Sequence, residues 1–193
     1  MFRSAVAATV LIAAPAVAAG DPAAVVGDFN NALIAAMQSG KGASLAARTA
    51  KLLPLVKATH DMPGMTRLVA GPVWATTAAA DREALIDAFT RHAALTYAVN
   101  FSSFDGEKFV VDPKVDQRGG DVLVHAAIVS RDDRHALNYR LHQAEGGWRI
   151  IDIYSDGVSQ VVTFRAEFAG TVKAGGAAAL AAKLSAADAA KLK

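Results

Sequence analysis

The sequence predicts an α+β fold, with N-terminal helices and a C-terminal helix packed on a curved four-stranded antiparallel sheet. Apolar residues recur at helical spacing through the first half of the chain, residues 22–99. Four strand-length runs follow Asp105 and Gly106, and the short turns between them favour antiparallel pairing. After Gly157 the spacing returns to three and four residues. Helices on one face of such a sheet give a cone-like domain.

The N-terminus resembles an export signal. Arg3 precedes an apolar run over residues 5–14, and small residues follow at 16–19. The run is shorter than the ~20 residues that span a bilayer, and Pro15 interrupts it, which argues against a membrane anchor. We therefore expect residues 1–19 to be a cleaved signal peptide. The remaining residues, 20–193, are enough for one domain and too few for two of ordinary size.

The composition disfavours several classes of function. The chain has no cysteine, so it can form neither a disulfide framework nor a thiolate metal site. An exported chain without cysteine fits a bacterial periplasm better than a small extracellular scaffold. The 20 basic and 18 acidic residues give a formal charge of +2, and the basic residues are scattered. We therefore expect no nucleic acid among its partners.

The first two helices are recognised by periodicity and by residues that stop it. The first is expected over residues 22–38, because a Gly-rich stretch at 39–42 ends its pattern. The second begins near Ser44. Pro54 should kink or end it, since proline cannot donate a helical hydrogen bond.

The next two helices are recognised by their caps. Asp61 stands at the N-cap of a short helix that runs to Gly71. Thr76 or Thr77 can cap the following helix, which continues to about Val99. The whole first half of the chain is therefore expected to be helical.

The second half is expected to form a meander of antiparallel strands. In the third strand Leu137, Tyr139 and Leu141 fall on one face, and polar side chains fall on the other. One face of the sheet should therefore be covered and the other wetter. The four strands are expected over residues 108–115, 121–130, 134–143 and 147–154.

The last helix is expected from Val158 to about Val172, with Ser155 or Asp156 as its cap. Two glycines at 175–176 should break it before an Ala-rich helical tail, whose last turns are expected to fray. An apolar stripe follows the helix, and such a stripe ordinarily belongs to a core. Its members are Val158, Val161, Val162, Phe168 and Val172.

Patterns for metal or nucleophilic chemistry are weak. His125, His135 and His142 lie on neighbouring expected strands. His135 and His142 have opposite parity along one strand, so both cannot point into one site without a bulge. The sequence has no H-E-x-x-H pattern, no G-x-S-x-G elbow and no phosphate-cradling glycine pattern. We expect no metal, no cofactor and no catalytic residue.

Asp152 is the best candidate for an enzymatic alternative. It lies within the apolar run 150–154 and would have a raised pKa if it faced the interior. Small α+β cones include isomerases and dehydratases that use such an acid. The other interpretation is that Asp152 points outward or accepts a hydrogen bond from a nearby backbone amide. A lone acid without a second polar partner favours this second interpretation.

Two blocks of residues resemble a known family. The block over residues 138–172 carries a Tyr-x-Leu strand, a Gly-x-Trp turn, a strand ending in Asp, then Gly-Val-Ser, an aromatic-Arg pair and Phe. The block over residues 68–98 carries a Gly and a Trp at a helix end, then a Phe and a Thr-Tyr pair. The matching residues are Tyr139, Leu141, Gly146, Trp148, Asp152, Gly157, Val158, Ser159, Phe164, Arg165 and Phe168, and Gly71, Trp74, Phe89, Thr96 and Tyr97.

These blocks are similar to the signature of the periplasmic phospholipid-carrier family, the soluble component of the Mla lipid-transport system, also described as toluene-tolerance auxiliary proteins. The resemblance covers most of the mature chain and implies a single lipid-carrier domain over residues 20–193. Gly71-Pro72, Thr163 and the short Ala-rich tail depart from the family pattern. A related subgroup occurs with hopanoid biosynthesis genes, so a hopanoid is an alternative cargo.

The resemblance implies a deep apolar pocket for acyl chains, with the polar head near its mouth. Arg140 and Arg165 are candidates for contact with the headgroup, and each could equally form a structural ion pair. The expected pocket lining is Tyr97, Leu137, Tyr139, Leu141, Trp148, Ile150, Val158, Val161, Val162 and Phe168.

The resemblance also implies a shuttle between the outer and inner membranes, which would maintain outer-membrane lipid asymmetry without covalent chemistry. The implied partners are a phospholipid or another two-chain or polycyclic lipid, an inner-membrane ABC transporter with a ring-shaped lipid-binding subunit, and an outer-membrane lipoprotein complex. Two alternatives remain: a cone-shaped enzyme that uses Asp152 on an apolar substrate, and an interaction domain with a filled core.

Overall fold

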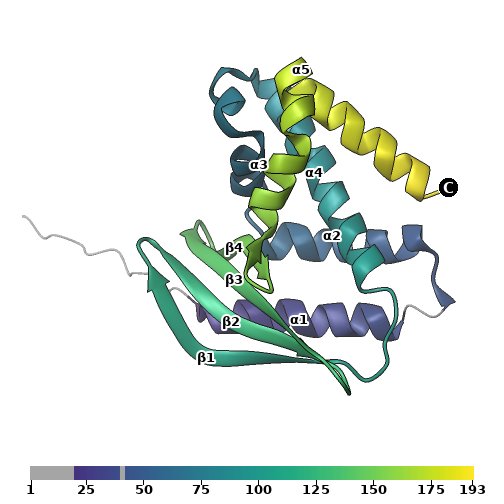
Figure 1. Cartoon of the computed structure of the whole chain (residues 1–193), viewed down its shortest axis with the longest axis vertical. Coiled ribbons are helices and arrows are strands. Elements are labelled where there is room, and N and C mark those ends of the chain that lie inside the picture. Colours follow the sequence, from purple (N-terminus) through teal and green to yellow (C-terminus); the bar gives the residue numbers. More distant parts are fainter. Residues whose placement is uncertain (1–19, 40–41) are drawn as a thin grey trace, which may run out of the picture.

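A meander of antiparallel strands forms the middle of the chain, and helices pack against one of its faces (Figure 1). The computed structural model describes residues 20–39 and 42–193, so the expected signal peptide lies outside the described residues. Within them the sheet has the order β1-β2-β3-β4-β5, which confirms the α+β fold and adds a strand of two residues. The strands are β1 Lys108–Arg118, β2 Asp121–Val129, β3 Arg134–Ala144, β4 Gly147–Ser155 and β5 Val158–Ser159.

The helices begin close to the positions that the sequence indicates. The Asp21 carboxylate accepts a hydrogen bond of 2.9 Å from Ala23 N, and the Asp61 carboxylate accepts one of 2.9 Å from Gly64 N. Both helix starts are therefore capped by side chains. The helices are α1 Pro22–Gln38, α2 Leu45–Thr59, α3 Met62–Ala70, the 3-10 helix η2 Gly71–Thr76, α4 Ala79–Asn100 and α5 Gln160–Lys191.

The structure contradicts the expected cap of α4, and of the two effects expected of Pro54, a kink or an end of α2, it excludes the end. Pro54 lies inside α2 and does not end it. Thr76 and Thr77 do not cap α4, because both hydroxyls donate to the carbonyl of Val73 in η2. Ala78 stands at the N-cap of α4 instead, without a side-chain hydrogen bond. The two threonine hydroxyls are thus hydrogen-bonded within and next to the 3-10 helix and are not available to cap α4.

The sheet is irregular at two places, and both favour curvature. The register of β1 against β2 shifts between Val111 and Val115. In β4, Ile151 is an extra residue opposite the neighbours Arg140 and Leu141 of β3. Such bulges bend a strand and increase its twist. The sheet can therefore curve around the side chains that the helices present to it.

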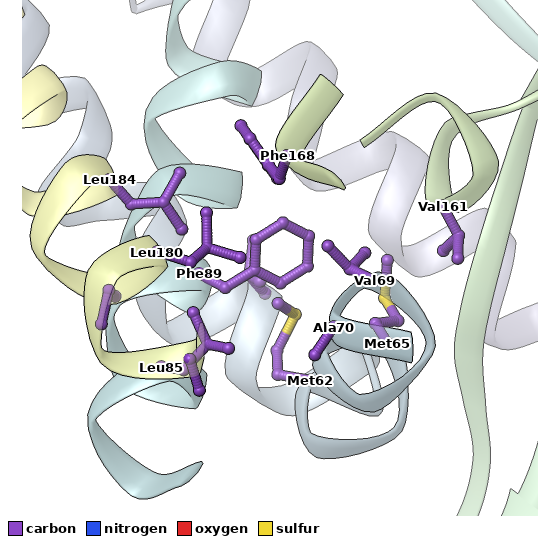
Figure 2. Close-up of a cluster of buried hydrophobic side chains, with 14 of the residues drawn as sticks. Met62, Met65, Val69, Ala70, Leu85, Phe89, Val161, Phe168, Leu180 and Leu184 are labelled. Carbon is purple, nitrogen blue, oxygen red and sulfur yellow. The ribbon is translucent and has the colours of Figure 1, made fainter. Parts of the chain in front are cut away.

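Buried apolar side chains form two clusters. One lies between α1, α2 and the sheet and includes Phe29, Leu33 and Leu141. The other lies between α3, α4 and α5, where Phe89 is surrounded by side chains from the neighbouring helices (Figure 2). The chain thus has a sheet-side core and a helix-side core, and the site lies where they meet.

The C-terminal tail is packed, so the expected fraying was wrong. Helix α5 is interrupted at Gly175 and Gly176, as the sequence predicts, and its second half folds back along α4 (Figure 1). Leu180 and Leu184 of this half are buried in the helix-side core. Asp188 Oδ1 lies 2.7 Å from Nδ1 of His92 in α4. None of the described helices is both long and apolar enough to cross a membrane.

Candidate functional site

A cavity of about 400 Å³ lies between the helix-side core and the sheet-side core. Most of its wall is apolar and comes from the helices α1, α3, α4 and α5, the segment after α4, and the strands β2, β3 and β4. Its exposed lining residues Asn100, Ser103 and His135 mark the opening. The apolar lining consists of Met37, Met65, Phe89, Ala93, Phe101, Ile128, Leu137, Ile153 and Phe164.

Two polar side chains of the cavity wall, those of His60 and Tyr97, are hydrogen-bonded to one another. His60 Nε2 lies 2.9 Å from Tyr97 Oη, and its Nδ1 lies 2.9 Å from Thr59 Oγ1. Burial lowers the pKa of His60 to about 3, because desolvation disfavours the charged ring. Thr59 Oγ1 donates its own proton to Leu55 O over 2.8 Å. His60 therefore donates from Nδ1 to Thr59 and accepts at Nε2 from Tyr97.

A second polar pair lies close by. Tyr139 Oη donates to Asn30 Oδ1 over 2.6 Å, and both residues are buried. Burial raises the pKa of both Tyr97 and Tyr139, so both phenols keep their protons. The ring of Phe29 makes edge contacts with the rings of His60, Tyr97 and Tyr139, at centroid distances of 4.9, 5.2 and 6.2 Å. An aromatic side chain therefore holds the two polar pairs in one cluster.

Stability should depend on pH through His60. In the unfolded chain the pKa of His60 is about 6.5, whereas in the folded protein it is about 3. The contribution of neutral His60 to the free energy of unfolding is thus fully present above about pH 6.5. It is lost as the pH falls from about 6.5 to about 3, by about 1.4 kcal/mol per pH unit. Urea unfolding of wild type and His60→Gln at several pH values measures it. Equal pH slopes for the two proteins would contradict this expectation.

Three of the ten expected pocket residues line the cavity, namely Tyr97, Leu137 and Tyr139. Leu141 and Ile150 are fully buried in the sheet-side core, and Trp148 packs against that core. These side chains support the sheet and do not line the cavity. The cavity residues that sequence reasoning missed include His60, Ala93 and Phe164.

The expected residues around the start of α5 divide between core and surface. Val161 and Phe168 lie in the helix-side core, and neither lines the cavity. Val158 and Val162 are 58% and 64% exposed. The physical reason is the cap: Ser159 Oγ accepts from Val162 N, so the helix begins at Gln160. Helical spacing then turns residues 161, 164 and 168 inward and residue 162 outward.

Arg140 and Arg165, the expected headgroup contacts, do not line the cavity. Arg140 forms an ion pair with Asp121, with its Nε and Nη2 atoms 2.6 and 2.5 Å from Oδ2. It lies on the face of β3 opposite to Tyr139. The exposed Arg165 lies over the backbone of Gly71, where a Cβ would come within 3.2 Å of its Nη2. Gly71 has a φ of 66°, a conformation that favours glycine.

Asp152 is buried, and its carboxylate accepts three hydrogen bonds. Its carboxylate accepts from Ile153 N, Val161 N and Ser159 Oγ over 2.8, 3.1 and 2.6 Å. These bonds join the end of β4 to the start of α5. The interpretation that Asp152 accepts from nearby backbone amides is confirmed. It does not line the cavity, so it is not placed to act on a molecule bound there.

The strand histidines all lie next to carboxylates. His125 Nε2 is 3.0 Å from Asp116 Oδ2, and His135 lies between Asp133 and Asp156, at 2.9 and 3.1 Å. His142 Nε2 lies 3.0 Å from Asp61 Oδ2 and has no hydrogen-bond partner among the described residues. Across residues 20–39 and 42–193, no three His, Asp or Glu side chains are grouped as a metal site.

Comparison with known proteins gives two matches. The model of the family described as MlaC protein matches residues 28–186. Among solved structures, a phospholipid-binding protein from Ralstonia solanacearum, in complex with a phospholipid, superposes with a TM-score of 0.78 at 21% identity. The match covers 90% of this chain and 100% of that one, and at this identity it shows a shared fold. No curated protein matches the sequence.

Proposed function

The chain belongs to the MlaC protein family, and from this premise we propose that it carries phospholipid in the cavity between its two cores. Members of this family are periplasmic phospholipid-binding components of the Mla ABC transport system and act as carriers, not as enzymes. We further propose that residues 1–19 are a cleaved signal peptide, that residues 20–193 form one carrier domain, and that this chain works in the periplasm.

The observation that carries the proposal is an apolar cavity that opens among polar side chains. Acyl chains with ~30 methylenes would lose roughly 24 kcal/mol if they met water, at about 0.8 kcal/mol each. A shuttle must therefore enclose them. The walls offer hydrocarbon from Ala93, Leu137 and Phe164, among others. The headgroup would remain at the opening, near Asn100 and Ser103.

The size of the cavity bears on how the carrier is loaded. Pockets for drug-sized ligands span about 300–1,000 Å³, so about 400 Å³ is at the lower end of that range. A two-chain lipid exceeds a drug-sized ligand, so we infer that the walls separate when it enters. Met37 and Met65 in the wall can adapt, because methionine is unbranched and flexible.

Affinity alone does not drive such a carrier. Lipid tails move from one hydrocarbon-like environment to another, so the net free energy gained is small. Loading and unloading should therefore depend on docking to membrane partners. We propose that these are an outer-membrane lipoprotein complex and an inner-membrane ABC transporter with a ring-shaped lipid-binding subunit.

We propose that polar side chains at the opening, and not Arg140 and Arg165, contact the headgroup, because neither arginine lines the cavity. Glu107, His135 and Gln160 line the cavity there together with Asn100 and Ser103. His135 lies between two carboxylates, and its pKa is raised because its Nδ1 donates a hydrogen bond to Asp156 and because Asp133 is negatively charged. An amine-bearing zwitterionic headgroup therefore suits this opening better than a bare anion.

Native mass spectrometry of the protein purified from its own periplasm tests the proposal. Lipid analysis of a solvent extract then identifies what is bound. We expect stoichiometric phospholipid. A polycyclic lipid such as a hopanoid would keep the carrier function and change its cargo. A bare protein that also refuses added phospholipid would contradict the proposal.

A further inference from the structure

A second hollow lies beside the cavity, between α2, α3 and α4. Its volume is about 300 Å³, and the exposed residues Lys57, Glu83 and Asp87 mark its opening to solvent. His60 lines both this hollow and the cavity. His60 is therefore common to the walls of two spaces. The rest of the hollow is lined by Met62, Pro63, Ile86 and Thr90.

The wall between the two spaces is thin. On α3, Met62 lines the hollow and Met65, one helical turn away, lines the cavity (Figure 2). On α4, Thr90 lines the hollow, and its neighbour Phe89 lines the cavity. Each helix therefore passes from one space to the other within a single turn. His60, which follows the last residue of α2, completes this wall.

The ring of His60 is held on several sides. Its two nitrogens lie 2.9 Å from Tyr97 Oη and 2.9 Å from Thr59 Oγ1. The ring of Phe29 makes an edge contact with it at a centroid distance of 4.9 Å, and only 4% of His60 is exposed. Rotation of the His60 ring would leave buried polar atoms unpaired, which is unfavourable. His60 is therefore a fixed part of the wall, unlike the flexible methionines of the cavity.

We propose that His60 closes the cavity against the second hollow and thereby limits the length of the acyl chains that the carrier accepts. The inference rests on the proposed carrier function and deepens it, because it names a residue that selects among phospholipids. An acyl chain that reaches His60 finds no further apolar space, so additional methylenes must remain outside the cavity. Each methylene left in water lowers the affinity by about fourfold.

Phosphatidylethanolamines of different chain length test the proposal. Vesicles with equal amounts of the dilauroyl, dimyristoyl, dipalmitoyl and distearoyl lipids are incubated with delipidated protein, and native mass spectrometry gives the loaded fraction of each. His60→Ala removes the ring and joins the hollow to the cavity. We expect this variant to load the longer lipids more than wild type does, by about fourfold for each methylene that gains space. An unchanged distribution in folded His60→Ala would overturn the proposal.

Ile86→Trp provides the matched control, because Ile86 lines the hollow and not the cavity. As a single change it should leave the distribution of loaded lipids unchanged, since His60 keeps acyl chains out of the hollow. Combined with His60→Ala, it should restore the wild-type distribution by filling the added space. A shift toward shorter lipids in the single Ile86→Trp variant would overturn the proposal, and this test does not require His60→Ala to fold. Failure of wild type to load any of the four lipids would overturn the carrier function itself.

Discussion

Ala93→Trp is expected to abolish most lipid loading while the protein stays folded. Ala93 lies on α4 and lines the cavity, so an indole ring at this position can project into the space that the lipid needs. Overpacking costs about 1–3 kcal/mol. Because the ring occupies the space of the ligand, this cost falls on the free energy of lipid binding and lowers the affinity by about fivefold to a hundredfold. Native mass spectrometry after incubation with phospholipid gives the loaded fraction.

The neighbouring residue provides the control. Ala94 is fully buried in the helix-side core and does not line the cavity. Ala94→Trp should therefore destabilise the fold, because no space receives the ring. Urea unfolding of the two variants separates a cavity from a filled core. If Ala93→Trp unfolded as readily as Ala94→Trp, the space beside Ala93 would be filled in solution and the carrier proposal would lose its site.

Leu180→Ala is expected to lower the free energy of unfolding by about 2–5 kcal/mol, the usual cost of a cavity in a packed core. Leu180 lies in the tail beyond the glycines of α5, and none of its side chain is exposed. It joins the helix-side core next to Phe89 and Phe168 (Figure 2). The tail is therefore an integral part of the domain. Denaturant unfolding followed by circular dichroism measures the loss.

Leu192→Ala is the matched control for this prediction. Leu192 lies in the same tail but is 39% exposed, so its truncation should change the free energy of unfolding by less than about 0.5 kcal/mol. Similar, small effects for both variants would mean that the tail is not docked in solution. A large effect for Leu180→Ala alone supports the packed arrangement.

Local sequence patterns predicted most of the secondary structure. The bounds of α1 and the starts of the four long strands agree with the apolar periods and the turns between them. Asp61 caps α3 as its position indicates, because an N-cap depends on residues only three positions away. The caps that failed, Thr76 and Thr77, were taken up by a 3-10 helix whose hydrogen bonds the periodicity does not reveal.

The cavity could be predicted only in part. Sequence reasoning placed Tyr97, Leu137 and Tyr139 in the site, but it treated Leu141 and Ile150 alike. Alternation along a strand shows which side chains face inward. It does not show whether the space they face is filled by a helix or left open. His60 gave no signal at all, because it lies at a junction between helices.

The sequence by itself determined the elements and their order, because these follow from short-range periods, caps and turns, and two blocks of its residues resembled the family that the comparison then showed. Only the tertiary structure decided which apolar side chains line a cavity and that the tail is packed. It also decided that Asp152 joins β4 to α5 and that Arg140 pairs with Asp121. The physical reason is that the hydrophobic effect removes side chains from water without specifying their neighbours. A cavity arises from contacts between segments far apart in the chain, and no local pattern encodes it.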